Sequence, residues 1–484
     1  MEAEELEVPG AAFERTKRRV GLFAGPVVAV ALALLARDGA SPALVGLLVL
    51  CVVWWLTEAL PMAVVALLAA VGAVLTGIAT PKQAFGAFGT PLLFLFVGSF
   101  FIAEAMRRHG LGVRIGRAMV RRARGRLSLL ILIGMTAFVQ SMFMSNAATT
   151  AILLPIAISV APVDHLRDRF GGALVLAVAW GASVGGLGTP VGTPPNLIGI
   201  AELEKRGLGL GFVEWMAIGV PMGTLMMLGL FVVLAVFFKI RRGQPLAQPL
   251  GEVSGPWNRG ERAVVIAAAI ALTGWLTPTL LTLVAPGSAA EHWADVHLTE
   301  EIVALIAGCS LFVIPGARAG EPPRPALLWS EATRIEWGVI LLFGGGILLG
   351  DLARSTGLAV EWGHAFVDAT GASSTWAIAA LVTAVAIVLS EMTSNTATAT
   401  LMAPLAGSLA EAAGAAPIPA ILGATMGASF GFMMPISTAP NALAFSTGRI
   451  SITEMVRAGI VFDVIGFALI LAALRIMCPL LGWA

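Results

Sequence analysis

The sequence has few charged side chains and no tyrosine. Only 12% of its 484 residues are charged, about half of the roughly 25% that is typical of soluble domains. Too few polar side chains therefore remain to cover a water-facing surface of this size. The net charge of +1 provides no basic field for a nucleic acid, so we expect no nucleic-acid partner. Without tyrosine, the 12 tryptophans must supply any aromatic belt at a membrane interface.

Cysteines and enzyme motifs are equally scarce. Cys51, Cys309 and Cys478 lie far apart in apolar surroundings, which argues against a disulfide framework or a metal site. The sequence contains no GxSxG elbow, no HExxH motif and no nucleotide-binding loop. A membrane-embedded hydrolase or transferase would need an activated nucleophile or metal ligands. We therefore expect that the protein is not an enzyme and has no organic cofactor.

Long apolar runs take the place of these features. Hydrophobic residues make up 58% of the chain, and the mean hydropathy is +0.90. Runs such as Val20–Ala36, Phe212–Phe238 and Ala263–Leu283 approach the ~20 residues that cross a bilayer as a helix. We predict an all-α polytopic membrane protein with about 11 transmembrane helices, embedded in the lipid bilayer of the cell (inner) membrane. Residues 1–19 are predicted to be a cytoplasmic N-terminal tail.

The chain is duplicated. Phe96–Ser99 followed by Glu104 resembles Phe343–Gly346 followed by Asp351, at an offset of 247. Two further pairs match at offsets of 249 and 245: Ser141-x-x-x-Ser145-Asn146 with Ser390-x-x-x-Ser394-Asn395, and Gly192-Thr193-Pro194-Pro195-Asn196 with Ser437-Thr438-Ala439-Pro440-Asn441. Three ordered matches near one offset indicate an internal repeat.

Positive charges predict opposite orientations for the two repeats. Residues 107–126 contain eight arginines, whereas residues 354–376 contain only Arg354 and no lysine. Arginine-rich loops stay in the cytoplasm, so equivalent parts of the repeats are expected on opposite sides of the membrane. This inverted-repeat construction is common among secondary transporters.

Two short segments rich in glycine predict re-entrant hairpins. Pro91–Met106 and Trp337–Leu352 are short for a membrane crossing and have glycine near the middle. The alternative is an ordinary spanning helix with packing glycines. Glu104 and Asp351 lie beside arginines, and we interpret them as ion pairs that anchor the hairpins.

Each repeat also places polar residues and helix breakers inside an apolar segment. Ser, Thr and Asn interrupt the first matched pair of motifs, and Gly and Pro break the second. Broken backbone at membrane depth is tolerated only where it is buried in protein or lines a cavity. Its N–H groups attract anions, and its carbonyls join hydroxyl and amide oxygens as ligands for a small cation. The alternative is that these side chains only link neighbouring helices.

The motifs contain no lysine or arginine that could neutralise an anion. A dianion in this low-dielectric site would need a bound cation beside it. Cation coupling is therefore a physical expectation.

These motifs, together with Trp55-Leu56-Thr57-Glu58-Ala59-Leu60-Pro61 and the run from Ala428 to Asn441, resemble the divalent-anion:sodium symporter family. The likeness extends from about Leu22 to the C-terminus. It implies sodium symport of small divalent anions such as the C4-dicarboxylates succinate, malate and fumarate. It also implies a homodimer whose protomers work by an elevator mechanism.

The resemblance assigns site residues by motif. One sodium site would use Ser141, Ser145, Asn146 and Gly192, and the second would use Ser390, Thr393, Asn395 and Ser437. The substrate carboxylates would contact Asn146, Thr193, Ser394, Asn395, Thr396 and Thr438. Ala147 and Ala439 replace the family's usual Thr and Pro, and the lost hydroxyl removes a hydrogen bond worth about 1 kcal/mol.

The expected domains follow the repeats. Residues 20–90 and 245–335 would form the scaffold, and residues 91–244 and 336–484 the moving transport part. A sodium-independent or proton-coupled carrier or exchanger of citrate, sulfate or another oxyanion remains the alternative, since oxygen-rich sites serve either cation. Glu391, inside the second motif, keeps a proton relay open.

Overall fold

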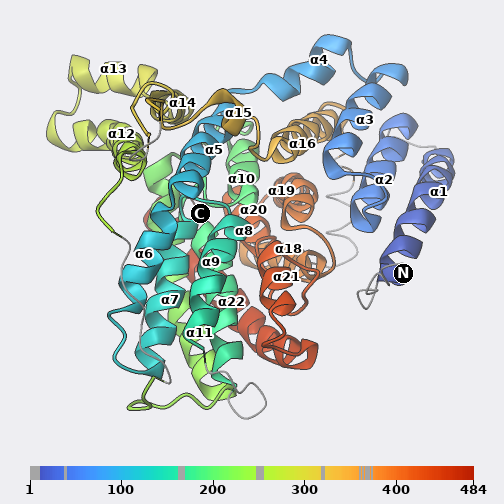
Figure 1. Ribbon diagram of the computed structural model, residues 1–484. Coiled ribbons are helices and arrows are strands. Elements are labelled where there is room, and N and C mark those ends of the chain that lie inside the picture. Colours follow the sequence, from blue (N-terminus) through green and yellow to red (C-terminus); the bar gives the residue numbers. More distant parts are fainter. Residues whose placement is uncertain are drawn as a thin grey trace. The chain divides into compact units, whose positions relative to one another are not determined.

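The protein is entirely helical where its structure is described. The computed structural model describes residues 11–36, 41–161, 169–246, 255–317, 322–358, 361, 365, 371 and 374–483. These ranges contain helices and one isolated bridge between Pro315 and Pro325, but no strand (Figure 1). The predicted all-α fold is confirmed.

The first half of the chain contains α1 (Ala11–Leu35), α2 (Pro42–Thr57), α3 (Met62–Leu75), α4 (Pro81–Gly86), the short 3₁₀ helix η1 (Ala87–Gly89), α5 (Pro91–His109), α6 (Leu111–Val120), α7 (Arg126–Ser141), α8 (Asn146–Ser159), α9 (Phe170–Gly186), α10 (Pro194–Glu204) and α11 (Phe212–Phe237). The second half contains α12 (Arg259–Val284), α13 (Ala289–His297), α14 (Glu300–Ser310), α15 (Trp329–Ala332), α16 (Trp337–Ser355), α18 (Thr375–Met392), α19 (Asn395–Ala412), α20 (Pro417–Gly427), α21 (Ala439–Ser446) and α22 (Ile452–Leu480).

Many of these helices suit a bilayer. Seven described segments are long and apolar enough to cross it: α1, the stretch from α4 through α5, α11, α12, α16, α18 and α22. Six shorter apolar helices accompany them: α2, α3, α7, α8, α9 and α20. Large apolar side chains such as Val232 and Val236 on α11 are exposed, as a lipid-facing surface requires. Residues 1–10 of the predicted tail lie outside the described residues, and residues 11–19 form the first turns of α1.

The duplication is visible in the order of the helices. The series α5, α7, α8, α9, α10 and α11 is followed by α16, α18, α19, α20, α21 and α22 in matching positions. Both series interrupt a helix at the Ser-Asn motif and again before the Pro-Asn motif. The repeat is therefore present in the structure as well as in the sequence.

The chain divides into two compact units. One comprises Met1–Thr90, Gly338–Ser373 and Ser408–Ala415, and the other comprises Pro91–Trp337, Ser374–Gly407 and Ala416–Ala484. In the first unit α2 packs against both α1 and α3. There Arg18 pairs with Glu58 at 3.1 Å, beside the C-terminus of α2.

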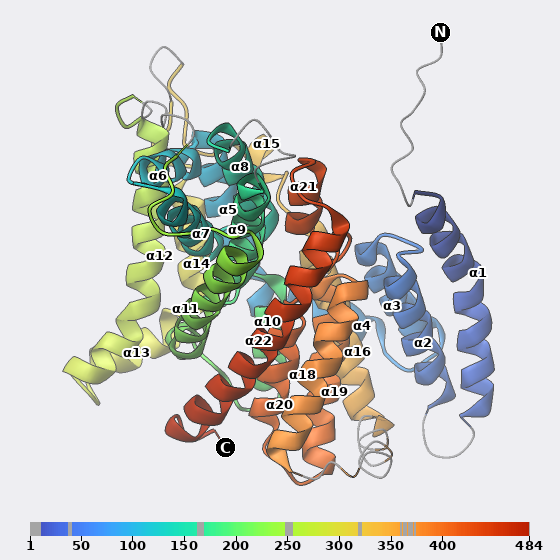
Figure 2. The ribbon, with the colours of Figure 1, turned by 90° about the horizontal axis from the view of Figure 1, so that it is seen from below.

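The second unit contains all the residues of the predicted sites and is built around α9. This helix is buried along its whole length and packs against α7, α8 and α11. In the second repeat, the corresponding helix α20 packs against α18 and α22 (Figure 2). Trp180 of α9 joins the two halves, because its ring stacks on Phe462 of α22 at 5.6 Å and meets Phe432 edge-on at 5.7 Å.

The predicted hairpins at Pro91–Met106 and Trp337–Leu352 are wrong. Each segment is part of one uninterrupted helix, α5 or α16. Their glycines serve close packing instead, since a Cβ on Gly98 would lie 2.3 Å from the backbone carbonyl of Ala304 in α14. The expected ion pairs are present within the helices: Arg107 Nε donates to Glu104 at 2.7 Å, and Arg354 pairs with Asp351.

We expect Gly98→Ala to lower the thermal stability of the protein. The added methyl group would collide with the backbone of α14, and overpacking of this kind costs about 1–3 kcal/mol. The melting temperature of the purified protein in detergent checks this. Gly89→Ala is the matched control, because a Cβ at Gly89 meets nothing within 4 Å. Equal melting temperatures for the two variants would contradict the packing role of Gly98.

Candidate substrate and cation site

The first Ser-Asn motif is a break between two helices. Helix α7 ends at Ser141 and α8 begins at Asn146. Ser145 is the N-cap of α8, and its hydroxyl accepts a hydrogen bond from Ala148 N at 3.3 Å. The Ser141 hydroxyl, which is fully buried, donates to Asn146 Oδ1 at 2.7 Å. Two predicted sodium ligands therefore touch across the break.

A second break, between α9 and α10, is held by one asparagine. The Asn196 amide donates to Gly186 O and to Thr189 O, both at 2.7 Å. Gly186 ends α9, and Thr189 lies in the non-helical stretch that follows. Asn196 thereby satisfies carbonyls that a continuous helix would have satisfied itself.

The two breaks of the first repeat meet. A Cβ on Gly186 would lie 2.6 Å from Asn146 Oδ1 and 3.1 Å from the Thr193 Cβ. A Cβ on Gly192 would lie 2.5 Å from Gly186 O, so only glycine allows this approach. The structure thus brings together Ser141, Asn146, Gly192 and Thr193 of the predicted set, with Ser145 at the N-terminus of α8.

The second repeat reproduces this arrangement. Ser390 Oγ lies 2.8 Å from Asn395 Oδ1 and 2.7 Å from Ala428 O. The Asn441 amide donates to Gly431 O at 2.7 Å and to Met434 O at 3.0 Å. With the offset of 245, these carbonyls correspond to those of Gly186 and Thr189. The equivalence extends to individual hydrogen bonds.

The remaining predicted residues of the second repeat lie at different places around the two helix breaks. A Cβ on Gly431 would lie 3.0 Å from the Thr438 side chain and 3.1 Å from the Ser437 Cβ. Thr393 Oγ1 lies 2.9 Å from Thr398 Oγ1.

Ser394 accepts a hydrogen bond from Ala397 N at 3.4 Å. Thr396 has a half-buried side chain, and its backbone carbonyl accepts from the Thr400 hydroxyl at 2.8 Å. Ser394 and Thr396 therefore lie at the N-terminus of α19.

The second repeat differs from the first in one contact. The Trp180 indole donates to Asn441 Oδ1 at 3.1 Å, whereas the buried Asn196 Oδ1 has no hydrogen-bond partner. The position that matches Trp180 is Thr425, whose buried hydroxyl also lacks a partner. The tryptophan therefore links α9 of the first repeat to α21 of the second, and Thr425 makes no corresponding bond to Asn196.

The predicted ligands of both clusters are backbone groups and neutral side chains. Thr193 and Thr438 are the N-caps of α10 and α21, where a helix carries partial positive charge. The described residues contain no group of three or more His, Cys, Asp or Glu that could hold a metal ion. Hydroxyl, amide and carbonyl oxygens suit an alkali cation, and the helix N-termini suit a carboxylate.

Two acidic residues near the clusters were not predicted as ligands. The Glu391 carboxylate accepts from Met433 N at 2.8 Å and from the Ser437 hydroxyl at 2.6 Å. The Glu336 carboxyl group lies beside the Ser145 side chain, and partial loss of hydration raises its pKa above the usual range. Glu391 stands inside a recognised motif, but Glu336 lies in the loop before α16, where no sequence pattern marks it.

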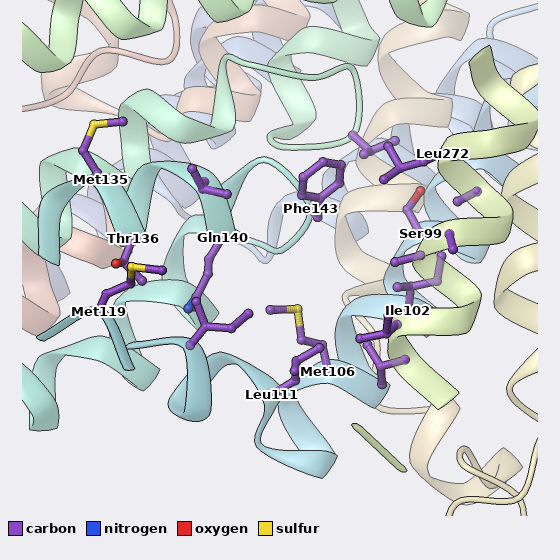
Figure 3. A pocket seen from close by; sticks show the side chains of 18 of the residues that line it. Ser99, Ile102, Met106, Leu111, Met119, Met135, Thr136, Gln140, Phe143 and Leu272 are labelled. Carbon is purple, nitrogen blue, oxygen red and sulfur yellow. The ribbon is translucent and has the colours of Figure 1, made fainter. Parts of the chain in front are cut away.

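An apolar cavity lies elsewhere in the second unit. It measures about 490 Å³ and is lined by apolar side chains of α5, α6, α7 and α12 (Figure 3). Met106, Leu111, Met119 and Met135 contribute to its wall, and Ser99, Thr136 and Gln140 supply its few polar atoms. A dianion would lose its hydration there without gaining charged or oriented partners. The cavity is therefore unsuited to the substrate.

Comparisons with known proteins identify a family and relatives of this chain. The family model described as citrate transporter (CitMHS) matches residues 52–426. The sodium-dependent dicarboxylate transporter SdcS of Staphylococcus saprophyticus is 30% identical over 487 residues, with 95% of this chain and 91% of that protein covered. SdcS of Staphylococcus aureus (strain USA300) is 30% identical over 448 residues, with 88% and 84% covered.

Two solved structures share the fold. The Alcanivorax borkumensis YdaH transporter aligns with a TM-score of 0.59 at 16% identity, covering 90% of this chain and 98% of that one. Neisseria gonorrhoeae MtrF aligns with a TM-score of 0.54 at 14% identity, covering 82% and 83%.

The family model and the 30% identical relatives identify the protein as a membrane transporter rather than an enzyme. More particularly, the chain belongs to the citrate transporter (CitMHS) family, and its relatives include sodium-dependent dicarboxylate transporters.

Glu204, at the C-terminus of α10, makes the stability of the protein depend on pH. The Glu204 side chain reaches solvent, yet partial loss of hydration and the nearby Glu300 and Glu301 raise its pKa from 4.5 to about 7. The folded protein thus keeps this proton up to about pH 7, whereas the unfolded chain releases it near 4.5. Its contribution to stability is full below pH 4.5 and is lost as the pH rises through 7.

We expect Glu204→Gln to raise the melting temperature at pH 8 and to leave it nearly unchanged at pH 4.5. The control is Asp295→Asn, the same acid-to-amide change at an exposed position on α13. Thermal melts of both variants at the two pH values decide the matter. A Glu204→Gln variant no more stable than wild type at pH 8 would refute the expectation.

Proposed function

We propose that this transporter carries small divalent anions, foremost C4-dicarboxylates such as succinate, malate and fumarate, by symport with sodium ions. The observation that carries the proposal is the mirrored pair of clusters in the second unit, each with neutral oxygen ligands beside a helix N-terminus. A dicarboxylate has two charges for two such N-termini. The names of the relatives support the same substrate and the same ion.

The proposed sodium positions follow the two Ser-Asn breaks. Ser141, Ser145, Asn146 and Gly192 would hold one ion, and Ser390, Thr393, Asn395 and Ser437 the other. Their hard oxygen atoms are ligands that an alkali cation accepts. The direct Ser141–Asn146 and Ser390–Asn395 contacts support this proposal, because they keep the oxygens of each set together.

The substrate would lie against the positive ends of the broken helices. Asn146, Thr193, Ser394, Asn395, Thr396 and Thr438 are the proposed contacts. Sodium next to the carboxylates would offset their charge, because no basic side chain occurs in the motifs. Asn146 and Asn395 would serve both ion and substrate, which couples their binding.

The transport cycle would be an elevator motion in a homodimer in the cell membrane, with the N-terminus in the cytoplasm. The moving part would comprise residues 91–244 and 336–484, and the scaffold residues 20–90 and 245–335. Every proposed ligand falls in the moving part, so ions and substrate would travel together. Citrate is the second candidate substrate, because the matching family model is described as a citrate transporter.

Uptake of labelled succinate into proteoliposomes tests substrate and coupling together. An inward sodium gradient should drive uptake that unlabelled malate or fumarate competes away, and an equal potassium gradient should not. Equal uptake in both salts would exclude sodium coupling. If succinate is not taken up but a sodium gradient drives uptake of citrate, citrate replaces the C4-dicarboxylates as the proposed substrate.

We expect Asn146→Ala and Asn395→Ala to abolish sodium-driven uptake while the protein remains folded in the membrane. Each change deletes an amide proposed to touch both the ion and the substrate. The control is Thr224→Ala on α11, whose exposed hydroxyl bonds only to the Val220 carbonyl in its own helix. Normal uptake by both asparagine variants would remove the proposed sites.

A further inference from the structure

The apolar cavity between α5, α6, α7 and α12 has no role in the proposed binding of substrate and ions. Its volume is about 490 Å³. An apolar cavity of about 150 Å³ is large enough to bind one benzene molecule, so this one has room for about 20 carbon atoms. Its walls lose packing contacts wherever nothing fills the space. The size and the apolar lining therefore fit one acyl chain.

The cavity lies between two groups of packed helices within the second unit. Helix α12 packs against α5 and α14, whereas α7 packs against α6, α8, α9 and α11. Figure 3 shows Met135, Thr136 and Gln140 of α7 on one side of the space and Leu272 of α12 on the other. An elongated apolar molecule can therefore contact both helices at once.

The opening of the cavity consists of apolar side chains. Val139 of α7 and Val265 of α12 both line the cavity, yet they are 51% and 44% exposed. Helix α12 is long and apolar enough to cross a bilayer, and α7 is one of the shorter apolar helices. Exposed apolar residues on such helices face lipid. A molecule that enters here therefore comes from the bilayer rather than from water.

A positive charge lies next to this opening. Arg262 is exposed and precedes Val265 by three residues and Ala269 by seven, so all three share one face of α12. Val265 and Ala269 line the cavity. Arg259, one turn earlier, is exposed as well. The basic start of α12 thus lies about one helical turn from the apolar opening.

These arginines are available to a ligand. The neighbouring carboxylate, Glu261, is already paired with Arg114 of α6 at 2.7 Å. Within the described part of the chain, no carboxylate pairs with Arg259 or Arg262. A guanidinium group binds phosphate oxygens through two parallel hydrogen bonds. An apolar cavity with an unpaired arginine at its opening is complementary to a chain with an anionic head.

We propose that the cavity holds one acyl chain of an anionic phospholipid whose phosphate pairs with Arg262. The chain would lie between α7 and α12, and the headgroup would lie at the start of α12. This end adjoins the arginine-rich segment 107–126, because Arg114 reaches Glu261, and such segments stay on the cytoplasmic side. The cytoplasmic leaflet carries anionic lipids. The site is separate from the proposed ion and substrate positions.

Thermal melts of the purified full-length protein, freed of lipid in detergent, test the headgroup and the chain separately. Dioleoyl phosphatidylglycerol should raise the melting temperature. Dioleoyl phosphatidylcholine, which has the same chains but no net charge, should do so much less, and glycerol phosphate, which has no chain, should have no effect. Equal stabilisation by phosphatidylcholine would overturn the phosphate pairing. Equal stabilisation by glycerol phosphate would overturn the occupation of the cavity.

Arg262→Gln keeps a polar side chain and removes the charge at the opening. We expect it to raise the phosphatidylglycerol concentration for half-maximal stabilisation about tenfold, because a charge-assisted hydrogen bond is lost. Arg457→Gln is the matched control, since Arg457 is an exposed arginine on α22, and it should behave as wild type. An unchanged response of Arg262→Gln would contradict the proposal.

Ala268→Phe places a ring in the space proposed for the chain, because Ala268 lines the cavity. We expect this variant to lose the stabilisation by phosphatidylglycerol, whereas Ala31→Phe, at an exposed position on α1, should keep it. Stabilisation of Ala268→Phe equal to that of wild type would refute occupation of the cavity.

Photo-crosslinking tests the same point on the wild-type chain, so it does not depend on the folding of a variant. Phosphatidylglycerol with a diazirine in one acyl chain should attach to residues of α7 or α12 that line the cavity. Adducts spread evenly over the exposed apolar helices, with none in the cavity, would overturn the proposal.

Discussion

The structure depends on satisfying backbone polar groups where helices break inside an apolar protein. A bilayer offers no water to a free carbonyl, so each such group needs a partner within the protein. Asn196 and Asn441 meet this need at equivalent positions, each donating to two backbone carbonyls at or beyond the end of the preceding helix. Without these side chains, the breaks that expose ligating groups would cost several kcal/mol apiece. The rest of the site is built on these two residues.

The same constraint explains the neutral character of the clusters. Once the asparagines have satisfied part of the backbone, the remaining oxygens and helix N-termini can bind ions of both signs. A fixed arginine would hold the anion in every state of the cycle, whereas a bound cation can arrive and leave with it. The proposed function therefore makes sodium a structural component of the loaded site.

Predictions from the sequence succeeded where a local residue pattern itself causes the structural feature, such as a helix break. The duplication was predicted because Ser-Asn and Pro-Asn motifs interrupt apolar helices at nearly constant offsets. The hairpins at Pro91–Met106 and Trp337–Leu352 were wrong because glycine permits either a turn or a close helix contact, and only the neighbouring helix decides. Gly98 lies against α14, some 200 residues further along the chain. Glu336 went unnoticed beside Ser145 because it stands in no motif.

By itself, the sequence determined the membrane setting, the helical class, the two repeats and the motifs at which helices break. These properties depend on hydrophobicity and on helix-breaking residues, which act over a few turns of chain. Tertiary structure alone decided which breaks meet, such as Asn146 with Gly186. It also decided that Trp180 bridges the repeats through Asn441. Such contacts join residues 40 to 261 positions apart, and no local periodicity encodes a distance of that kind.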